Sequence, residues 1–232
     1  MLDKRLRCAA DFVPNGARLA DIGSDHAYLP IALCLENKIS CALASDINEG
    51  PVAAAVANIN KNSLSKKITA VKADGLSGAE DFKPDCITLL GMGGELIVSI
   101  LSAAPWIKKE GIRIILQPMT HAETVAEYLA REGFTVNDEK IICCQDREDR
   151  IYRILCAEYT GERREISGIE SLIGKANLDR ADCDTLLYVK RALRVLRTRI
   201  DGKKKAGLDF LEEKALADSL EAFLSEHKDQ NR

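Results

Sequence analysis

The 232-residue chain lacks the sequence features of several protein classes. It has no run of about 18 uncharged apolar residues, so we expect no transmembrane helix. The segment from Met1 to Arg7 has no apolar signal core, and the eight cysteines form no Cys-x-x-Cys pair. We therefore expect a cytoplasmic protein with buried free thiols, no membrane partner and no bound metal.

Residues 1–160 alternate short apolar runs with helical patterns, which is typical of a parallel α/β sheet. The expected strands are 17–22, 40–45, 67–72, 85–90 and 112–117, and the expected helices are 28–37, 51–62, 94–103 and 121–132. Two further extended runs, 134–144 and 150–159, are joined by a charged turn at 145–149. Strands joined by so short a turn must pair antiparallel. We therefore expect a parallel sheet that ends in an antiparallel hairpin.

Residues 161–232 contain no obvious strand, and we interpret them as a second, α-helical domain. Apolar residues recur there at steps of three and four, as a heptad seam; they are Leu186, Val189, Leu193, Leu196 and Ile200. Gly202 and Gly207 bracket a basic turn. The apolar side of the helix expected after it consists of Leu208, Leu211, Leu216, Leu220 and Phe223. The pattern predicts a coiled-coil-like helical hairpin in a monomer, with a dimer interface as the alternative use of the seam.

Positive charge is concentrated in one segment, although the formal net charge of the chain is −3. Residues 190–205 contain eight basic side chains against Asp201 alone. Such a surface can bind nucleic acid even in an acidic protein, and a solvated helix face is the alternative. The predicted nucleic-acid contacts are Arg5, Arg7, Lys190, Arg191, Arg194, Arg197, Lys203, Lys204 and Lys205. For the first two, an exposed face of an amphipathic helix is an equal alternative.

Polar residues and glycines follow four of the expected strands. In open α/β sheets, ligands bind beyond the carboxyl ends of the strands. Gly23 would let the backbone turn tightly against a ligand. Asp46 lies 25 residues after Asp21, where a carboxylate can accept hydrogen bonds from ribose hydroxyls. Asp74 can accept from an adenine amino group, although aspartates at strand ends also serve as helix caps.

The chemistry of these strand ends favours one cofactor. The loop after the first strand lacks the Gly-x-Gly-x-x-Gly spacing of a dinucleotide site, and Asp25 would repel a pyrophosphate. S-adenosylmethionine (SAM) carries a sulfonium and an ammonium group, which suit a pocket with several carboxylates. We therefore predict SAM rather than the nicotinamide cofactor of an oxidoreductase. The predicted cofactor contacts are Asp21, Gly23, Ser24, His26, Asp46, Asn48, Asp74, Gly75, Gly91, Met92 and Gly93.

Five motifs together resemble the bacterial tRNA (adenine 22-N1)-methyltransferase family. They are LADIGSDHAYLPI, ASDINEGP, DGL, GMGGELI and ILQP, in the family's order, between about Arg5 and Tyr159. The resemblance implies a Rossmann-like class I methyltransferase fold and methyl transfer from SAM to N1 of adenine 22 in the D-loop region of tRNA. One departure is Lys175, where we would expect a proline after the glycine. This difference concerns how the helical tail docks.

The implied reaction needs no base, because adenine N1 already carries a lone pair. Catalysis then depends on orientation and on a negative group near the charge that develops on the ring. The segment 91–94 supplies neither a carboxylate nor an aromatic ring. We predict that Asp25 provides the negative charge, Tyr28 stacks on the base and Gln117 bonds an adenine edge. For Asp25 the alternatives are ordering of the SAM ammonium group and helix capping. For Tyr28 the alternative is core packing, and for Gln117 it is a strand-end cap.

Two other functional hypotheses stay open at this point. The chain could methylate a protein or a small molecule, but a basic helical hairpin would have no role in such a reaction. It could also be a non-catalytic module that binds SAM or tRNA, because the loop after the fourth strand lacks an obvious catalytic side chain.

Overall fold

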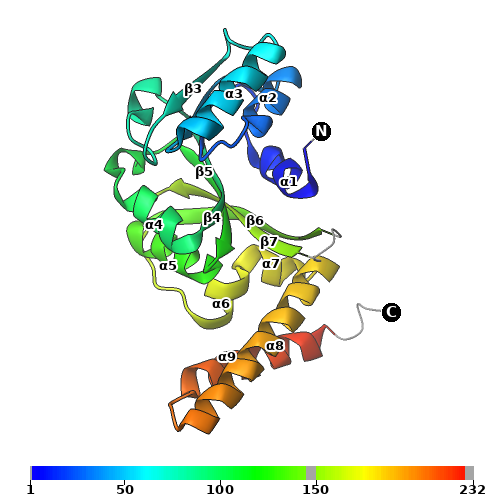
Figure 1. Ribbon diagram of the computed structural model, residues 1–232. Helices are drawn as coiled ribbons and strands as arrows, with labels where there is room; N and C mark the ends of the chain where they lie inside the picture. Colours follow the sequence, from blue (N-terminus) through cyan, green and yellow to red (C-terminus); the bar gives the residue numbers. More distant parts are fainter. Residues whose placement is uncertain (1, 145–149, 228–232) are drawn as a thin grey trace.

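The computed structural model describes residues 2–144 and 150–227. Figure 1 shows an α/β body from which a helical hairpin projects. The charged turn predicted at residues 145–149 lies outside the described residues. Within the described segments, no helix combines the length and apolar character needed to cross a membrane.

A seven-stranded sheet forms the centre of the body. Its strands are β1 (Ala17–Ile22), β2 (Ile39–Asp46), β3 (Ile68–Lys72), β4 (Cys86–Gly93), β5 (Arg113–Thr120), β6 (Phe134–Cys144) and β7 (Arg150–Tyr159). Their order is β3-β2-β1-β4-β5-β7-β6. Strand β7 runs antiparallel to both of its neighbours, β5 and β6, and all other neighbouring strands are parallel. The predicted parallel sheet with an antiparallel hairpin is thereby confirmed. The strand order reverses between β1 and β4, which is where such sheets bind ligands.

Helices cover both faces of the sheet (Figure 1). One face carries α1 (Lys4–Phe12), α2 (Tyr28–Leu35) and α3 (Glu49–Lys61), and the other carries η1 (Ala79–Phe82), α4 (Gly94–Ser102), η2 (Pro105–Ile107) and α5 (Ala122–Glu132). Each face has its own apolar cluster, around Leu33 and Ile115 on one side and around Ile97 and Leu116 on the other. Burial on both faces explains the continuous apolar runs of the central strands. The sequence predicted the first helix only as the alternative for Arg5 and Arg7, as the face of an amphipathic helix.

The described part of the tail, up to residue 227, contains four helices. The two long ones form the predicted hairpin (Figure 1). The four helices are α6 (Gly168–Ile173), α7 (Lys175–Arg180), α8 (Cys183–Ala206) and α9 (Leu211–Glu226). All five seam residues of α8 are buried, in one cluster with Leu220 and Phe223 of α9 and Ile141 of β6. The seam therefore packs within a single chain.

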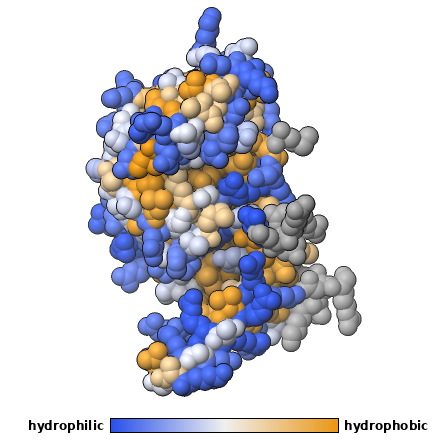
Figure 2. Space-filling view, viewed as in Figure 1, coloured by the Kyte–Doolittle hydropathy of each residue, from blue (hydrophilic) through white to orange (hydrophobic). Residues whose placement is uncertain are grey.

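Two predicted details of the hairpin are wrong. Helix α8 continues through Gly202 to Ala206, so the basic turn is the last turn of a helix. The chain reverses only at Gly207, whose φ of +67° suits a helix C-terminus. Leu208 and Leu211 are exposed rather than packed, and the tip carries an apolar patch in Figure 2. Phe210 packs against the buried cluster instead, because it follows the reversal and faces α8.

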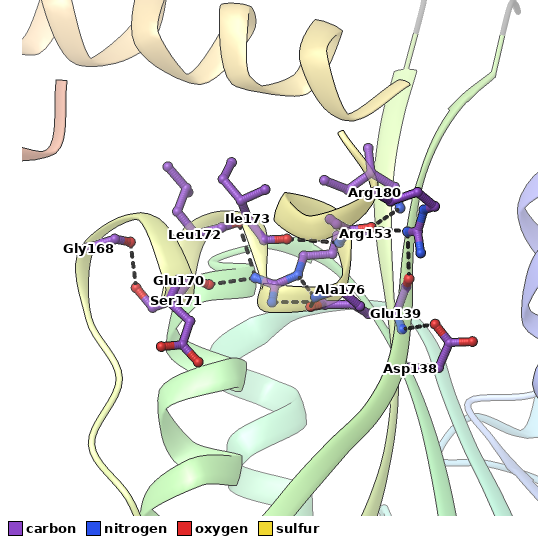
Figure 3. Close-up of polar contacts among 12 residues, drawn as sticks. Asp138, Glu139, Arg153, Gly168, Glu170, Ser171, Leu172, Ile173, Ala176 and Arg180 are labelled. Carbon is purple, nitrogen blue, oxygen red and sulfur yellow. Dashed lines mark hydrogen bonds and ion pairs between the residues drawn. The ribbon is translucent and has the colours of Figure 1, made fainter. Parts of the chain in front are cut away.

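A buried ion pair fixes the tail to the sheet (Figure 3). Arg153 of β7 and Glu139 of β6 are joined at 2.7 Å, and their side chains are only 2% and 3% exposed. Arg153 also donates to the carbonyls of Ser171 and Leu172 in α6, and the backbone N–H of Ala176 donates to Glu139. These contacts cross residue 160, where the sequence places a boundary between domains 1–160 and 161–232. That division stays a prediction.

The Gly174-Lys175 step belongs to this docking site. Gly174 has a φ of +88°, and a Cβ there would overlap the Glu139 carboxylate. Lys175 is the first residue of α7, a position that favours proline but does not require it. Its Nζ pairs with Asp179 at 2.9 Å. The glycine, rather than the residue after it, therefore permits the tail to dock.

No disulfide joins the eight cysteines, all of which lie among the described residues, but not all of their thiols are buried as expected. Five are buried, Cys41 and Cys144 are half-buried, and Cys183 is exposed. The exposed thiol is the first residue of α8 and lies outside the apolar seam of that helix.

Candidate cofactor and acceptor site

Asp21 ends β1 as a buried carboxylate. Its two oxygens accept hydrogen bonds of 2.6 Å from the hydroxyls of Ser24 and Thr88. Burial raises the pKa of Asp21, while these hydroxyls and the charge of Arg5 act in the opposite direction. Both oxygens are thus engaged within the protein, so this carboxylate shapes the loop. Its predicted contact with a cofactor stays a prediction.

The loop after β1 is tightly constrained. Gly23 has a φ of +70°, and a Cβ there would overlap the terminal methyl of Met92. The glycine therefore leaves room for Met92 near the end of β4, in addition to the close ligand approach predicted for it. The Ser24 N–H donates to the Ser45 carbonyl at 2.8 Å, and Asn58 donates to the His26 carbonyl at 3.0 Å. The loop after β1 and the end of β4 therefore lie against each other at the predicted site.

Asp25, His26 and Tyr28 form an exposed group above this loop. The Asp25 carboxylate lies 3.3 Å from Nε2 of His26, and the imidazole stacks on the Tyr28 ring at 5.2 Å between centroids. Helix α2 begins at Tyr28, and its N-cap Ala27 adopts a left-handed conformation with no side-chain cap. The capping alternative for Asp25 is therefore wrong. So is the core-packing alternative for Tyr28, which is 55% exposed.

The predicted residues after β2 and β3 also lie at the carboxyl ends of the parallel strands. Asp46 accepts hydrogen bonds at 2.8 Å from the backbone and at 3.3 Å from the side chain of Asn48. Asp74 is exposed and lines a hollow of about 550 Å³ beside α4, together with Gly75. Carboxylates thus follow three of the parallel strands, where the sequence predicts them.

Exposed apolar side chains surround the same edge, and most were missed by sequence reasoning. Tyr28 follows β1, Ile47 follows β2, Leu96 follows β4 and Met119 lies near the end of β5; all are 46–55% exposed. Apolar side chains left open beside polar groups are typical of ligand pockets. An apolar residue directly after a strand-ending acid, such as Ile47 after Asp46, is a signal that could have found them.

Gln117 lies inside β5, which extends beyond the predicted end of this strand to Thr120, and it is fully buried. Its Oε1 accepts a 2.7 Å hydrogen bond from Arg5, and its Nε2 donates to the Pro118 carbonyl at 2.9 Å. Gly91 at the end of β4 lies against the same Arg5, and Gly93 lies beside Thr120. The other predicted cation of α1, Arg7, makes two hydrogen bonds with Glu36 on the surface. The structure therefore brings Arg5 to the site and keeps Arg7 away from it.

The cations of α8 differ in their partners. Lys203 pairs with Glu213 of α9, Arg197 pairs with Glu221, and Lys204 lies over the Phe210 ring. Lys190 and Arg194 line a shallow hollow of about 390 Å³ with Arg197. The remaining predicted cations, Arg191 and Lys205, are exposed. Acidic side chains of α9 thus offset part of the charge near the tip, and the Lys190–Arg194 face is the more open.

The described residues contain no group of three or more His, Cys, Asp or Glu that could hold a metal ion. The site at the sheet edge therefore consists of carboxylates, exposed apolar rings and chains, and one arginine.

Comparisons with known proteins agree with this geometry. The profile of a family described as "Methyltransferase domain" matches residues 2–155. The chain is 41% identical over 162 residues to the tRNA (adenine(22)-N(1))-methyltransferase of Bacillus subtilis, covering 70% of this chain and 66% of that protein. The crystal structure of the B. subtilis M1A22 tRNA methyltransferase TrmK is similar with a TM-score of 0.84 and 32% identity, covering 97% and 98% of the two chains. Streptococcus pneumoniae Sp1610 in complex with S-adenosyl-L-methionine gives 0.82 and 29%, covering 95% and 99%.

Proposed function

The chain belongs to the family of tRNA (adenine(22)-N1)-methyltransferases, and we propose that it transfers the methyl group of SAM to N1 of adenine 22 in tRNA. One observation carries the proposal. Carboxylates and exposed apolar side chains together follow neighbouring parallel strands, beside the point where the strand order reverses. A cationic, adenine-bearing cofactor fits that combination.

The chain's own residues account for binding of the cofactor. Asp46 accepts from ribose hydroxyls, and Ile47 packs on the adenine ring of the cofactor. Asp74 accepts from the adenine amino group at the hollow beside α4. Ser24, Asn48 and the backbone of Gly23, Gly75, Gly91 and Gly93 complete the pocket, and Met92 lines it. The bound cofactor supplies an electrophilic methyl group on a sulfonium.

The exposed group of Asp25, His26 and Tyr28 orients the acceptor base and stabilises its charge. Tyr28 offers an exposed ring on which an extruded adenine stacks. Asp25, held beside His26, places a negative charge near the ring that becomes positive on methylation. Because N1 needs no deprotonation, these residues orient the base and stabilise charge, and none acts as a general base.

The helical hairpin binds the tRNA substrate through phosphate contacts. Lys190, Arg194 and Arg197 line one hollow on α8, in which three cations outnumber the single acid, Asp201. Lysine and arginine side chains on one helix face suit the regular spacing of phosphates. Because the apolar seam is used within the chain, the protein acts as a monomer, in the cytoplasm where its substrate is found.

A labelling experiment tests the function directly. The protein is incubated with SAM labelled in its methyl group and an unmodified tRNA transcript, and the nucleosides are then analysed. We expect label in 1-methyladenosine, and none when adenine 22 is replaced by guanine. Label that persists in the guanine variant would show a different target position. SAM binding by calorimetry without label in any tRNA would favour another acceptor or a non-catalytic module.

A further inference from the structure

Helix α1 carries three cations, and one of them differs from the others. Lys4 pairs with Asp184 at 3.6 Å, and Arg7 makes two hydrogen bonds with Glu36. Among the described residues, Arg5 makes no ion pair with a carboxylate, and its hydrogen bond goes to the neutral amide of Gln117. A partly buried guanidinium next to a neutral partner is a natural site for an anion.

Arg5 lies at the mouth of the proposed active site. Its Nη1 is 2.7 Å from Oε1 of Gln117, inside β5. The same nitrogen is 3.4 Å from where a Cβ of Gly91 would stand, at the end of β4. The next residue, Met92, reaches over Gly23 in the β1 loop. The guanidinium therefore borders the loop at which methyl transfer is proposed.

We propose that Arg5 binds a phosphate that flanks the target adenosine and that Gln117 orients Arg5 for this contact. The proposal rests on the proposed function. A guanidinium has five N–H donors in a planar fork, and Gln117 occupies one of its nitrogens. The fork matches the geometry of a phosphate. Every nucleotide inside an RNA chain brings such a phosphate with its base.

The contacts of Gln117 make it a positioning residue. It is fully buried, and arginine only donates, so the amide must turn Oε1 towards Arg5. Its Nε2 then donates to the Pro118 carbonyl. Reversing the amide would break both hydrogen bonds, so the orientation is fixed. This replaces the prediction that Gln117 bonds an adenine edge.

The other side of Arg5 is also supported by the protein. The guanidinium carbon lies 5.9 Å from the centroid of the Tyr152 ring of β7. A ring on one face and an amide at one edge hold the fork in place while its other donors stay available. A target base must leave its stack to be methylated, and a preoriented phosphate contact would hold the extruded nucleotide in line with the methyl donor.

The test combines a protein variant with a chemically altered substrate. Single methylphosphonates, which remove one negative charge, are placed on either side of adenine 22 in an otherwise unmodified tRNA. Methylation rates at limiting tRNA are then measured for the wild type, Arg5→Ala, Arg5→Lys and Gln117→Met. Lys66→Ala is the control. It removes one exposed charge from the loop before β3, the edge strand on the opposite side of the sheet from β6. Calorimetry of SAM binding and thermal unfolding accompany each variant.

We expect kcat/KM of Arg5→Ala to fall about tenfold or more, with SAM affinity unchanged and partial recovery in Arg5→Lys. One of the two methylphosphonates should slow the wild type and the control by a similar factor but cause no further loss in Arg5→Ala. Gln117→Met should weaken that coupling. A purely structural role would instead give multiplicative losses in every combination, and that result would overturn the proposal.

The result for the wild type distinguishes a failure of this proposal from a failure of the proposed function. If the wild type methylates adenine 22 but the losses multiply, only the role of Arg5 fails. If the wild type transfers no methyl group to adenine 22 of the unmodified tRNA, the proposed function and this inference fall together. Should Arg5→Ala unfold, the comparison of Arg5→Lys with the wild type on the two methylphosphonates decides the matter.

Discussion

At the scale of single residues, the exposed Asp25 carboxylate is the strongest candidate for a direct role in chemistry. Its side chain is 70% exposed and is held by His26 rather than by the helix end. We expect Asp25→Ala to slow single-turnover methylation by about a hundredfold, the usual effect of removing one group that stabilises developing charge. SAM binding measured by calorimetry should persist.

The control for Asp25 is Asp11→Asn, which neutralises an exposed carboxylate near the end of α1. It should leave the rate of methyl transfer unchanged. A rate for Asp25→Ala within about threefold of the wild type, at saturating SAM, would contradict a role in charge stabilisation.

The buried carboxylate of Asp21 leads to a prediction about how the stability of the protein depends on pH. Burial raises its pKa in the folded protein, so the stability that it contributes is fully present below its unfolded pKa of about 3.9. That contribution is lost as the pH rises through the folded pKa. Asp21→Asn is neutral throughout, so its melting temperature should rise relative to the wild type as the pH increases above about 4. A constant or falling difference in thermal unfolding would contradict this.

At the scale of elements, two glycines of the tail should respond oppositely to alanine. Gly202 lies inside α8 with open space around it, so Gly202→Ala should stabilise the protein by about 0.5–1 kcal/mol. Gly174→Ala should destabilise it by more than about 1 kcal/mol, because φ is +88° and the Cβ would meet Glu139. Urea denaturation measures both. Destabilisation by Gly202→Ala would mean that α8 is interrupted at this residue.

The same elements show what local patterns can and cannot predict. The strands 134–144 and 150–159 follow directly from their runs of extended-structure formers and coincide with β6 and β7. The end of α8 was predicted too early because glycine is a frequent helix terminator. The neighbours of Gly202 favour a helix and no atom crowds it, so the helix continues. Short α6 and α7 were missed because their formation depends on Arg153 and Glu139 beneath them, far away in the sequence.

At the scale of the whole molecule, the proposed function assigns catalysis to the body and tRNA binding to the hairpin. We expect Lys190→Ala with Arg194→Ala to weaken tRNA binding and to reduce the slope of log affinity against log salt by about 2. SAM binding should not change. The double variant Lys61→Ala with Lys66→Ala removes the same charge from exposed positions around the α3–β3 connection, and should leave the slope unchanged. Equal slopes in the two double variants would contradict a phosphate-binding role for α8.

Point variants are preferable to removing residues 161–232. The tail supplies the carbonyls of Ser171 and Leu172 to Arg153, and it covers Ile141 of β6. Truncation would leave a buried ion pair without part of its hydrogen bonding. A loss of tRNA binding would then reflect damage to the sheet as much as loss of the basic face.

The amino-acid sequence alone determined the sheet, its antiparallel end, the seam of the hairpin and the strand ends at which a cofactor would bind. These features depend on periodicity and on residues adjacent in the chain. Only the tertiary structure decided which polar groups meet. Arg5 and Gln117 are separated by 112 positions, and the pairing of Lys203 with Glu213 depends on where α8 reverses. Side-chain partners are set by how whole elements pack, so a charge count finds the cations but not those left available for a ligand.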